Sequence, residues 1–165
     1  SVVVRTVGGL WARLDPRASN LGVYRSTDTA IELLGVAGAA EAEGTLVRYG
    51  TPVELLRFPL RVGAMWSVES TTVESMVQNT PVASRDRYDV TVDARGEVRL
   101  TELTFADAVR VRVETTQRFP AGPGVRRIQY LWMVECYGEA ARMTSLDNEV
   151  NPDFTMAVEF RRLGL

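Results

Sequence analysis

Apolar and polar residues alternate with a period of two along much of this 165-residue chain. In residues 108–114 valines alternate with charged side chains, and residues 88–93 and 154–161 repeat the pattern. This alternation places apolar side chains on one face of a β-strand and polar side chains on the other. No stretch combines the i, i+3, i+4, i+7 spacing of an amphipathic helix with capping residues. The pattern therefore predicts an all-β protein.

Turn residues separate the alternating segments. The sequence of residues 93–96 ends in a glycine and predicts a hairpin between the strands before and after it. The Pro and Gly residues of 120–124 predict a second reversal. Residues 38–44 are expected to form a surface loop or a single turn, and residues 75–84 a long connection. We expect strands at 2–7, 10–14, 21–26, 30–36, 45–49, 52–57, 66–73, 87–93, 97–103, 108–117, 125–136, 140–146 and 154–162.

This order of strands and short turns indicates consecutive antiparallel pairing. We expect a single β domain over residues 1–165, built as an antiparallel meander whose strongly curved sheet closes towards a barrel or sandwich. The alternating positions also predict which side chains form its core. The expected core residues are Val23, Leu33, Leu55, Phe58, Leu60, Trp66, Val90, Val92, Val109, Val111, Val113, Tyr130, Trp132, Phe154, Val158 and Phe160.

The segment 125–136 departs from simple alternation because it is apolar on both faces. Tyr130 and Trp132 lie on one face, and Leu131 and Met133 lie on the other. A strand of this kind is normally covered on both sides. It forms either the middle of the core or one wall of a ligand cavity or protein contact. The candidate ligand-binding residues are Trp66, Tyr130, Leu131, Trp132 and Met133.

Composition narrows the chemistry, because the chain has no His and all 19 of its positive side chains are Arg. Catalytic sites that use a Ser-His, Cys-His or Lys nucleophile are therefore excluded. The net charge of −2 argues against a nucleic-acid partner. A single cysteine, Cys136, cannot form an internal disulfide, and its place in the apolar segment predicts a buried, inert thiol. No apolar run is long enough for a transmembrane segment.

The remaining candidates for chemistry are carboxylates and arginines. Pairs such as Asp86 and Asp89 or Asp93 and Glu97 are expected to be solvated charges beside turns. The oxygen-rich loop 147–153 could hold a cation, although a polar hairpin loop is favoured. Arg99, Arg110, Arg112 and Arg126 are expected to form an exposed Arg face with Glu97, Glu102 and Glu114 as cross-strand partners. We therefore predict no catalytic residues, no metal site and no cofactor.

Three patches carry a resemblance to a known group of proteins. Residues 58–66 match a Phe-Pro-Leu-x-x-Gly-x-x-Trp signature, and residues 104–111 are similar to a Thr-Phe-x-x-Ala-x-x-Val strand start. Residues 130–142 are similar to an aromatic strand followed by a Gly turn and a returning strand. Together they resemble an uncharacterised group of bacterial envelope β-domains, exported or lipoprotein-like. The resemblance implies a periplasmic, outer-membrane-associated or extracellular location.

Three functions are compatible with these features. We expect a non-enzymatic, extracytoplasmic structural or protein-interaction domain, such as a subunit of an envelope assembly, with a protein partner or self-association. The alternative is a carrier or sensor of an apolar, lipid-like small molecule held inside the curved sheet. A carboxylate-based glycan hydrolase is the third hypothesis, which requires two carboxylates facing one cleft.

Overall fold

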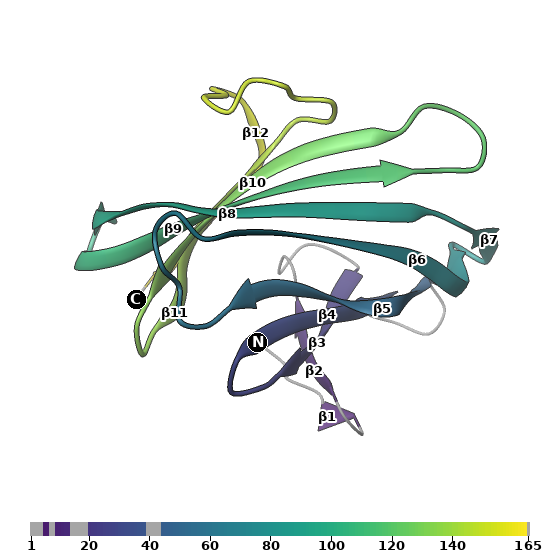
Figure 1. The fold of residues 1–165 in the computed structure, drawn as a ribbon, viewed down its shortest axis with the longest axis horizontal. Coiled ribbons are helices and arrows are strands. Elements are labelled where there is room, and N and C mark those ends of the chain that lie inside the picture. The colour runs from purple at the N-terminus through teal and green to yellow at the C-terminus, as the bar shows by residue number, and fades with distance from the viewer. Residues whose placement is uncertain (1–4, 7–8, 14–19, 39–43, 165) are drawn as a thin grey trace. The chain divides into compact units, whose positions relative to one another are not determined.

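The protein is described by a computed structural model that covers residues 5–6, 9–13, 20–38 and 44–164 (Figure 1). All regular structure in these residues is β-strand, and no helix in them is long and apolar enough to cross a membrane. The strands are β1 Arg5–Thr6, β2 Gly9–Arg13, β3 Asn20–Ser26, β4 Ala30–Gly38, β5 Leu46–Arg57, β6 Met65–Val77, β7 Thr80–Val82, β8 Arg85–Arg99, β9 Thr104–Arg118, β10 Val125–Val134, β11 Gly138–Ser145 and β12 Ala157–Arg162.

The strands follow one another in the sheet in the same order as in the chain. Each strand from β1 to β12 is hydrogen-bonded to the next, except that β7 pairs with β6 and lies off this path. The recorded registers are all antiparallel. β-bulges interrupt several of them and bend the bulged strands. The predicted all-β antiparallel meander is confirmed.

Contacts divide the chain into two compact units. Unit 1 consists of Ser1–Pro59, Val68–Asp86 and Arg118–Pro123. Unit 2 consists of Leu60–Ser67, Arg87–Gln117 and Gly124–Leu165. The expectation of a single domain over residues 1–165 stays a prediction.

In unit 1 the core lies between β4 and β5, where Leu33, Val53 and Leu56 are buried. β4 carries a bulge beside Gly35, and there the two backbones approach very closely. A Cβ atom at Gly35 would lie only 2.1 Å from the carbonyl oxygen of Val47. Any side chain at this position would force the strands apart, so the close approach requires glycine.

Buried polar side chains replace missing ladder bonds between β5 and β6. The Ser75 hydroxyl accepts a hydrogen bond from the Arg48 backbone N–H at 3.0 Å. Further along, the Ser70 hydroxyl accepts one from the Thr51 N–H at 3.1 Å. Both serines are buried. They satisfy backbone donors that would otherwise be left unpaired where the register is irregular.

In unit 2 one face of β8, β9 and β10 forms an apolar layer. Its side chains alternate along the strands and are almost fully buried. Figure 1 shows the three long strands of this layer. The buried members are Val90, Val92, Val111, Val113 and Leu131.

Several boundaries differ from the sequence prediction. The hairpin expected at 93–96 is wrong, because β8 runs through these residues and the chain turns at 100–103 instead. The segments 45–49 and 52–57 form one strand, β5, and the expected connection 75–84 contains β7. Residues 39–43, part of the expected loop 38–44, lie outside the described residues, as do 2–4, 7 and 14 of the first two predicted strands.

The predicted core is correct for seven buried residues: Leu33, Val90, Val92, Val111, Val113, Tyr130 and Phe154. Six more are half-buried, Val23, Leu55, Leu60, Trp66, Val109 and Trp132, and the prediction is wrong for three. Of these three, Phe58 is 38% exposed, Val158 59% and Phe160 61%. Phe58 directly follows β5 in unit 1, and a cis peptide bond joins it to Pro59. The other two side chains, Val158 and Phe160, lie on β12, which is the last strand in the sheet order.

Candidate functional site

Strand β10 lies between β9 and β11, and its register defines two faces. Trp132 is directly opposite Arg110 on β9, and Tyr130 is directly opposite Arg112. Directly paired residues project from the same face of a sheet, so these four side chains share one face. Leu131 pairs with Val111 and projects from the other face. Tyr130 and Leu131 are both buried, which confirms that β10 is covered on both sides there.

An aromatic cluster forms on the first of these faces. The ring centroid of Tyr130 lies 6.2 Å from that of Trp132 and 5.9 Å from that of Phe154. Ile128 and Met143 pack against the same rings. Phe154 belongs to the loop between β11 and β12, so this loop acts as a cover for β10. This cover loop spans residues 146–156.

The hydroxyl of Tyr130 joins the strand to the cover loop. It donates a hydrogen bond to the Pro152 carbonyl oxygen at 3.0 Å. Burial raises the pKa of Tyr130 above its ordinary value, because the charged phenolate is disfavoured away from water. The phenol therefore remains a neutral donor, as a structural contact requires.

An arginine side chain lies over the Tyr130 ring. The guanidinium carbon of Arg110 lies 4.9 Å from the ring centroid, which is cation–π geometry. The same guanidinium donates two hydrogen bonds to the Asp93 carboxylate, at 2.8 and 3.1 Å. This bond to Asp93 raises the pKa of Arg110 above its ordinary value. The Arg110 guanidinium is therefore held by the Asp93 carboxylate and the Tyr130 ring.

A small hollow of about 130 Å³ lies beside this cluster. Arg110 and Trp132 line it together with residues 94–98 and Ala108. Pockets that enclose small molecules are typically about 300–1,000 Å³ and largely apolar. This hollow is smaller than that and contains charged side chains, so it lends no weight to an apolar-ligand carrier.

The five candidate ligand-binding residues do not form one site. Tyr130 and Trp132 contact each other, whereas Leu131 and Met133 project from the opposite face of the same strand. Trp66 is half-buried on β6, and β8 and β9 separate β6 from β10 in the sheet order. The strand order therefore does not bring these five residues to one shared cavity.

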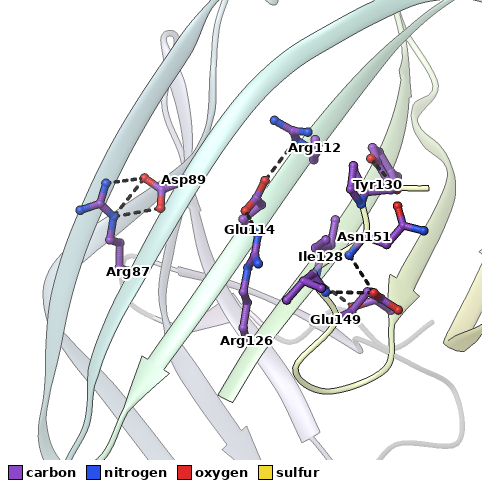
Figure 2. Close-up of polar contacts among 12 residues, drawn as sticks. Arg87, Asp89, Arg112, Glu114, Arg126, Ile128, Tyr130, Glu149 and Asn151 are labelled. Carbon is purple, nitrogen blue, oxygen red and sulfur yellow. Dashed lines mark hydrogen bonds and ion pairs between the residues drawn. The ribbon is translucent and has the colours of Figure 1, made fainter. Parts of the chain in front are cut away.

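The Arg face is present but its charges are paired. Figure 2 shows Glu114 between Arg112 and Arg126. The Arg126 guanidinium donates to the Glu114 carboxylate at 2.6 Å, and Arg112 Nε lies 3.5 Å from its other oxygen. Arg99 pairs with Glu97 on its own strand, and Arg110 pairs with Asp93. These contacts form a half-exposed ion-pair ladder along β8, β9 and β10.

The candidate carboxylates are likewise engaged. Asp86, in unit 1, is buried and accepts a hydrogen bond from the Tyr49 hydroxyl at 3.0 Å. In unit 2, Asp89 accepts hydrogen bonds from Arg87, which lower the pKa of that carboxyl (Figure 2). Asp93 is bound by Arg110. The described residues contain no group of three or more Asp, Glu or Cys side chains arranged to hold a metal ion.

The side-chain oxygen atoms of the loop 147–153 accept hydrogen bonds from the loop backbone and from β10. Asp147 accepts a hydrogen bond from Arg127 on β10 at 2.5 Å, which lowers the pKa of this carboxyl. Glu149 accepts hydrogen bonds from the backbone N–H groups of Val150 and Asn151. The Asn151 side chain in turn accepts one from the Asp153 N–H. These contacts fix a polar turn, as the sequence favoured.

Cys136 is not buried, so the expectation from its apolar segment is wrong. β10 ends at Val134, and Cys136 lies exposed in the turn before β11 with a φ of 65°. A left-handed backbone at a non-glycine residue is uncommon and is typical of tight turns. The apolar pattern of 125–136 extended the strand two residues too far.

A row of exposed apolar side chains in unit 2 lies at its last strand. Met156 is 64% exposed and precedes β12, whose Val158 and Phe160 are similarly exposed. The described residues give β12 one strand neighbour, β11, because β12 ends the sheet order. Sequence reasoning assigned these side chains to the core by their alternation. The signal available against it was the charge of Arg161 and Arg162 beside them.

Comparison with known proteins adds no further constraint on this surface. No family model, no curated protein and no solved structure matches the chain.

Proposed function

We propose that this chain is a non-enzymatic protein-interaction domain that binds its partner through β12 and the end of the cover loop. The observation that carries the proposal is the row of exposed apolar side chains Met156, Val158 and Phe160, which lie just before and on the last strand of the sheet order. Apolar side chains that gather on a surface are typical of contact sites. An edge strand also offers unpaired backbone groups to an incoming strand.

The non-enzymatic part of the proposal is supported by the state of the carboxylates. The chain has no His and no Lys, so acid–base catalysis would depend on Asp and Glu. Asp86, Asp93 and Asp147 are bound by Tyr49, Arg110 and Arg127 respectively. Carboxylates held in this way stabilise the fold and are poorly suited to exchange protons with a substrate.

We extend the proposal to a location outside the bacterial cytoplasm, as a subunit of an envelope assembly. This part rests on the resemblance of residues 58–66, 104–111 and 130–142 to envelope β-domains. An interaction domain without catalytic groups is consistent with a role in such an assembly.

Photo-cross-linking in the cells that produce the chain tests the interaction surface. A photoreactive phenylalanine analogue replaces Met156, and in a matched control it replaces Tyr137, which is 66% exposed in the β10–β11 turn. We expect discrete protein adducts from position 156 and none of the same size from position 137. Identical adducts from both positions, or none from position 156, would contradict the proposal.

A further inference from the structure

We propose that the partner of β12 is a second copy of this chain, joined by antiparallel β12–β12 pairing centred on Phe160. This inference rests on the proposed function, because it names the partner of the same strand. It comes from three properties of β12: the direction of its backbone groups, the order of its charges and the exposure of Phe160.

The first property is the direction of the backbone groups. The Leu163 N–H donates to the Ala140 carbonyl oxygen at 2.8 Å. Hydrogen-bonded and non-bonded pairs alternate along an antiparallel ladder, so the next bonded pairs are Arg161 with Arg142 and Glu159 with Thr144. The backbone groups of Phe160 and Arg162 are therefore directed away from β11, to the side of β12 that has no strand neighbour among the described residues.

This direction limits the registers that two copies can adopt. Outward-directed residues can exchange hydrogen bonds only with outward-directed residues of the other copy. The outward-directed residues have even numbers, so in a symmetric pair the two-fold axis passes through a residue and not between two residues. In this short strand that central residue is Glu159, Phe160 or Arg161. A two-fold axis between identical strands is the usual symmetry of a dimer.

The order of charges selects among these three centres. A centre at Glu159 places two glutamates directly opposite each other, and a centre at Arg161 places two arginines opposite each other. Both arrangements are unfavourable, because like charges in direct cross-strand pairs repel. A centre at Phe160 places Glu159 of each copy opposite Arg161 of the other, so it forms two pairs of opposite charge.

Neighbouring charges in the protomer are compatible with the same arrangement. Arg161 is directly opposite Arg142 on β11, a pair of like charges. Its carboxylate neighbour is Glu159 of its own strand, 2.8 Å away. Arg142 is bound by Glu139 of its own strand, and the proposed register brings a second Glu159 to Arg161 without placing like charges opposite each other.

The apolar side chains gain cover in the same register. Phe160 is 61% exposed in the protomer and would lie directly opposite Phe160 of the second copy. Aromatic cross-strand pairs are among the favourable contacts of antiparallel sheets. A contact through one short strand is small, so we expect a concentration-dependent dimer rather than an obligate one.

Charge reversal tests the register directly by sedimentation equilibrium of the 165-residue chain. Glu159→Arg and Arg161→Glu each place like charges opposite each other in the proposed dimer. We expect each variant alone to dimerise at least about tenfold more weakly than the unmodified chain. In an equimolar mixture the two variants form complementary pairs at both positions, so we expect dimerisation to return close to its original strength.

Two controls separate this effect from loss of folding. Circular dichroism and thermal unfolding check that each variant folds, and Glu97→Arg on β8 is a matched reversal that should leave dimerisation unchanged. If Arg161→Glu fails to fold, Phe160→Ser replaces it and should be monomeric at concentrations where the unmodified chain dimerises.

The possible results test self-pairing, its register and its assignment to β12 separately. An unmodified chain that stays monomeric overturns self-pairing, and cross-linking of another protein at position 156 would then leave the proposed function standing. A dimer that is weakened by both variants but not restored by mixing overturns the register. A dimer that neither variant weakens overturns the assignment to β12.

Discussion

Strands β10 and β12 both carry large apolar side chains at alternate positions, but those side chains lie in opposite environments. Tyr130 on β10 is buried, whereas Phe160 on β12 is 61% exposed. β10 has β9 and β11 as neighbours, and the cover loop places Phe154 against its aromatic face. β12 ends the sheet order. Alternation therefore predicts which side chains share a face, but the cover on that face depends on neighbours elsewhere in the chain.

The largest expected difference between the two strands is in stability. Ile128 on β10 is completely buried against Tyr130 and Phe154. We expect Ile128→Ala to lower the free energy of unfolding by about 2–5 kcal/mol, because it removes buried methyl groups and leaves a cavity. Urea denaturation measures this change. A loss below about 1 kcal/mol would show that the face is not a packed core.

A smaller effect is expected from the bond between β10 and its cover loop. Tyr130→Phe removes the hydroxyl that donates to the Pro152 carbonyl oxygen. We expect a loss of about 1 kcal/mol in the free energy of unfolding, typical of one hydrogen bond. Tyr137→Phe is the matched control, since Tyr137 is exposed and should change stability little. Equal effects of the two substitutions would contradict a structural role for the Tyr130 hydroxyl.

A weaker and pH-dependent contribution is expected from the ion pair that attaches the other end of the cover loop. Arg127 lowers the pKa of Asp147, so this carboxylate stabilises the fold above its unfolded pKa of about 4 and loses that effect as the pH falls through the lowered value. Both side chains are half-exposed, so Asp147→Asn should cost less than about 1 kcal/mol at pH 7. Urea denaturation at pH 7 and at pH 3 should show the difference between the two proteins shrinking. A constant difference would contradict the assignment.

The smallest change in stability is expected on β12. Phe160→Ala removes an exposed side chain, so we expect the free energy of unfolding to change by less than about 0.5 kcal/mol. The measurement is made in dilute solution, where self-pairing would not contribute. A loss comparable to that of Ile128→Ala would mean that Phe160 is covered within the protomer, and the comparison between the strands would fail.

The sequence was sufficient to predict the strand type and the buried valines of β8 and β9 in unit 2. Val90, Val92, Val111 and Val113 alternate with polar residues, and all four are buried. The two-faced character of β10 was also readable, because Tyr130 and Leu131 are adjacent and both large. These features are local, since the period of a strand depends on consecutive residues alone.

The hairpin expected at 93–96 shows where local turn chemistry is misleading. Asp93 and Arg95 have the composition of a turn, but both side chains pair with β9, to Arg110 and Asp107. Such cross-strand ion pairs hold the segment extended. The observed turn at 100–103 has neither Gly nor Pro. A backbone hydrogen bond from the Leu100 N–H to the Leu103 carbonyl oxygen closes it.

The candidate site was harder to predict than the fold, because exposure is not a local property. The exposure of Val158 and Phe160 depends on β12 having no second strand neighbour among the described residues. Trp66 and Trp132 were grouped because both are aromatic, yet two strands separate them in the sheet order. Sequence alternation contains no information on either fact.

The close approach at Gly35 has a consequence for how mutational tolerance is interpreted. A Cβ atom there would overlap the Val47 carbonyl oxygen, so a saturation scan should find that every substitution at this position is rejected. An invariant position in such a scan is easily taken for part of an active or binding site. At Gly35 the intolerance comes from two backbones in contact, whereas Phe160, the centre of the proposed partner contact, should accept many residues in any assay of folding alone.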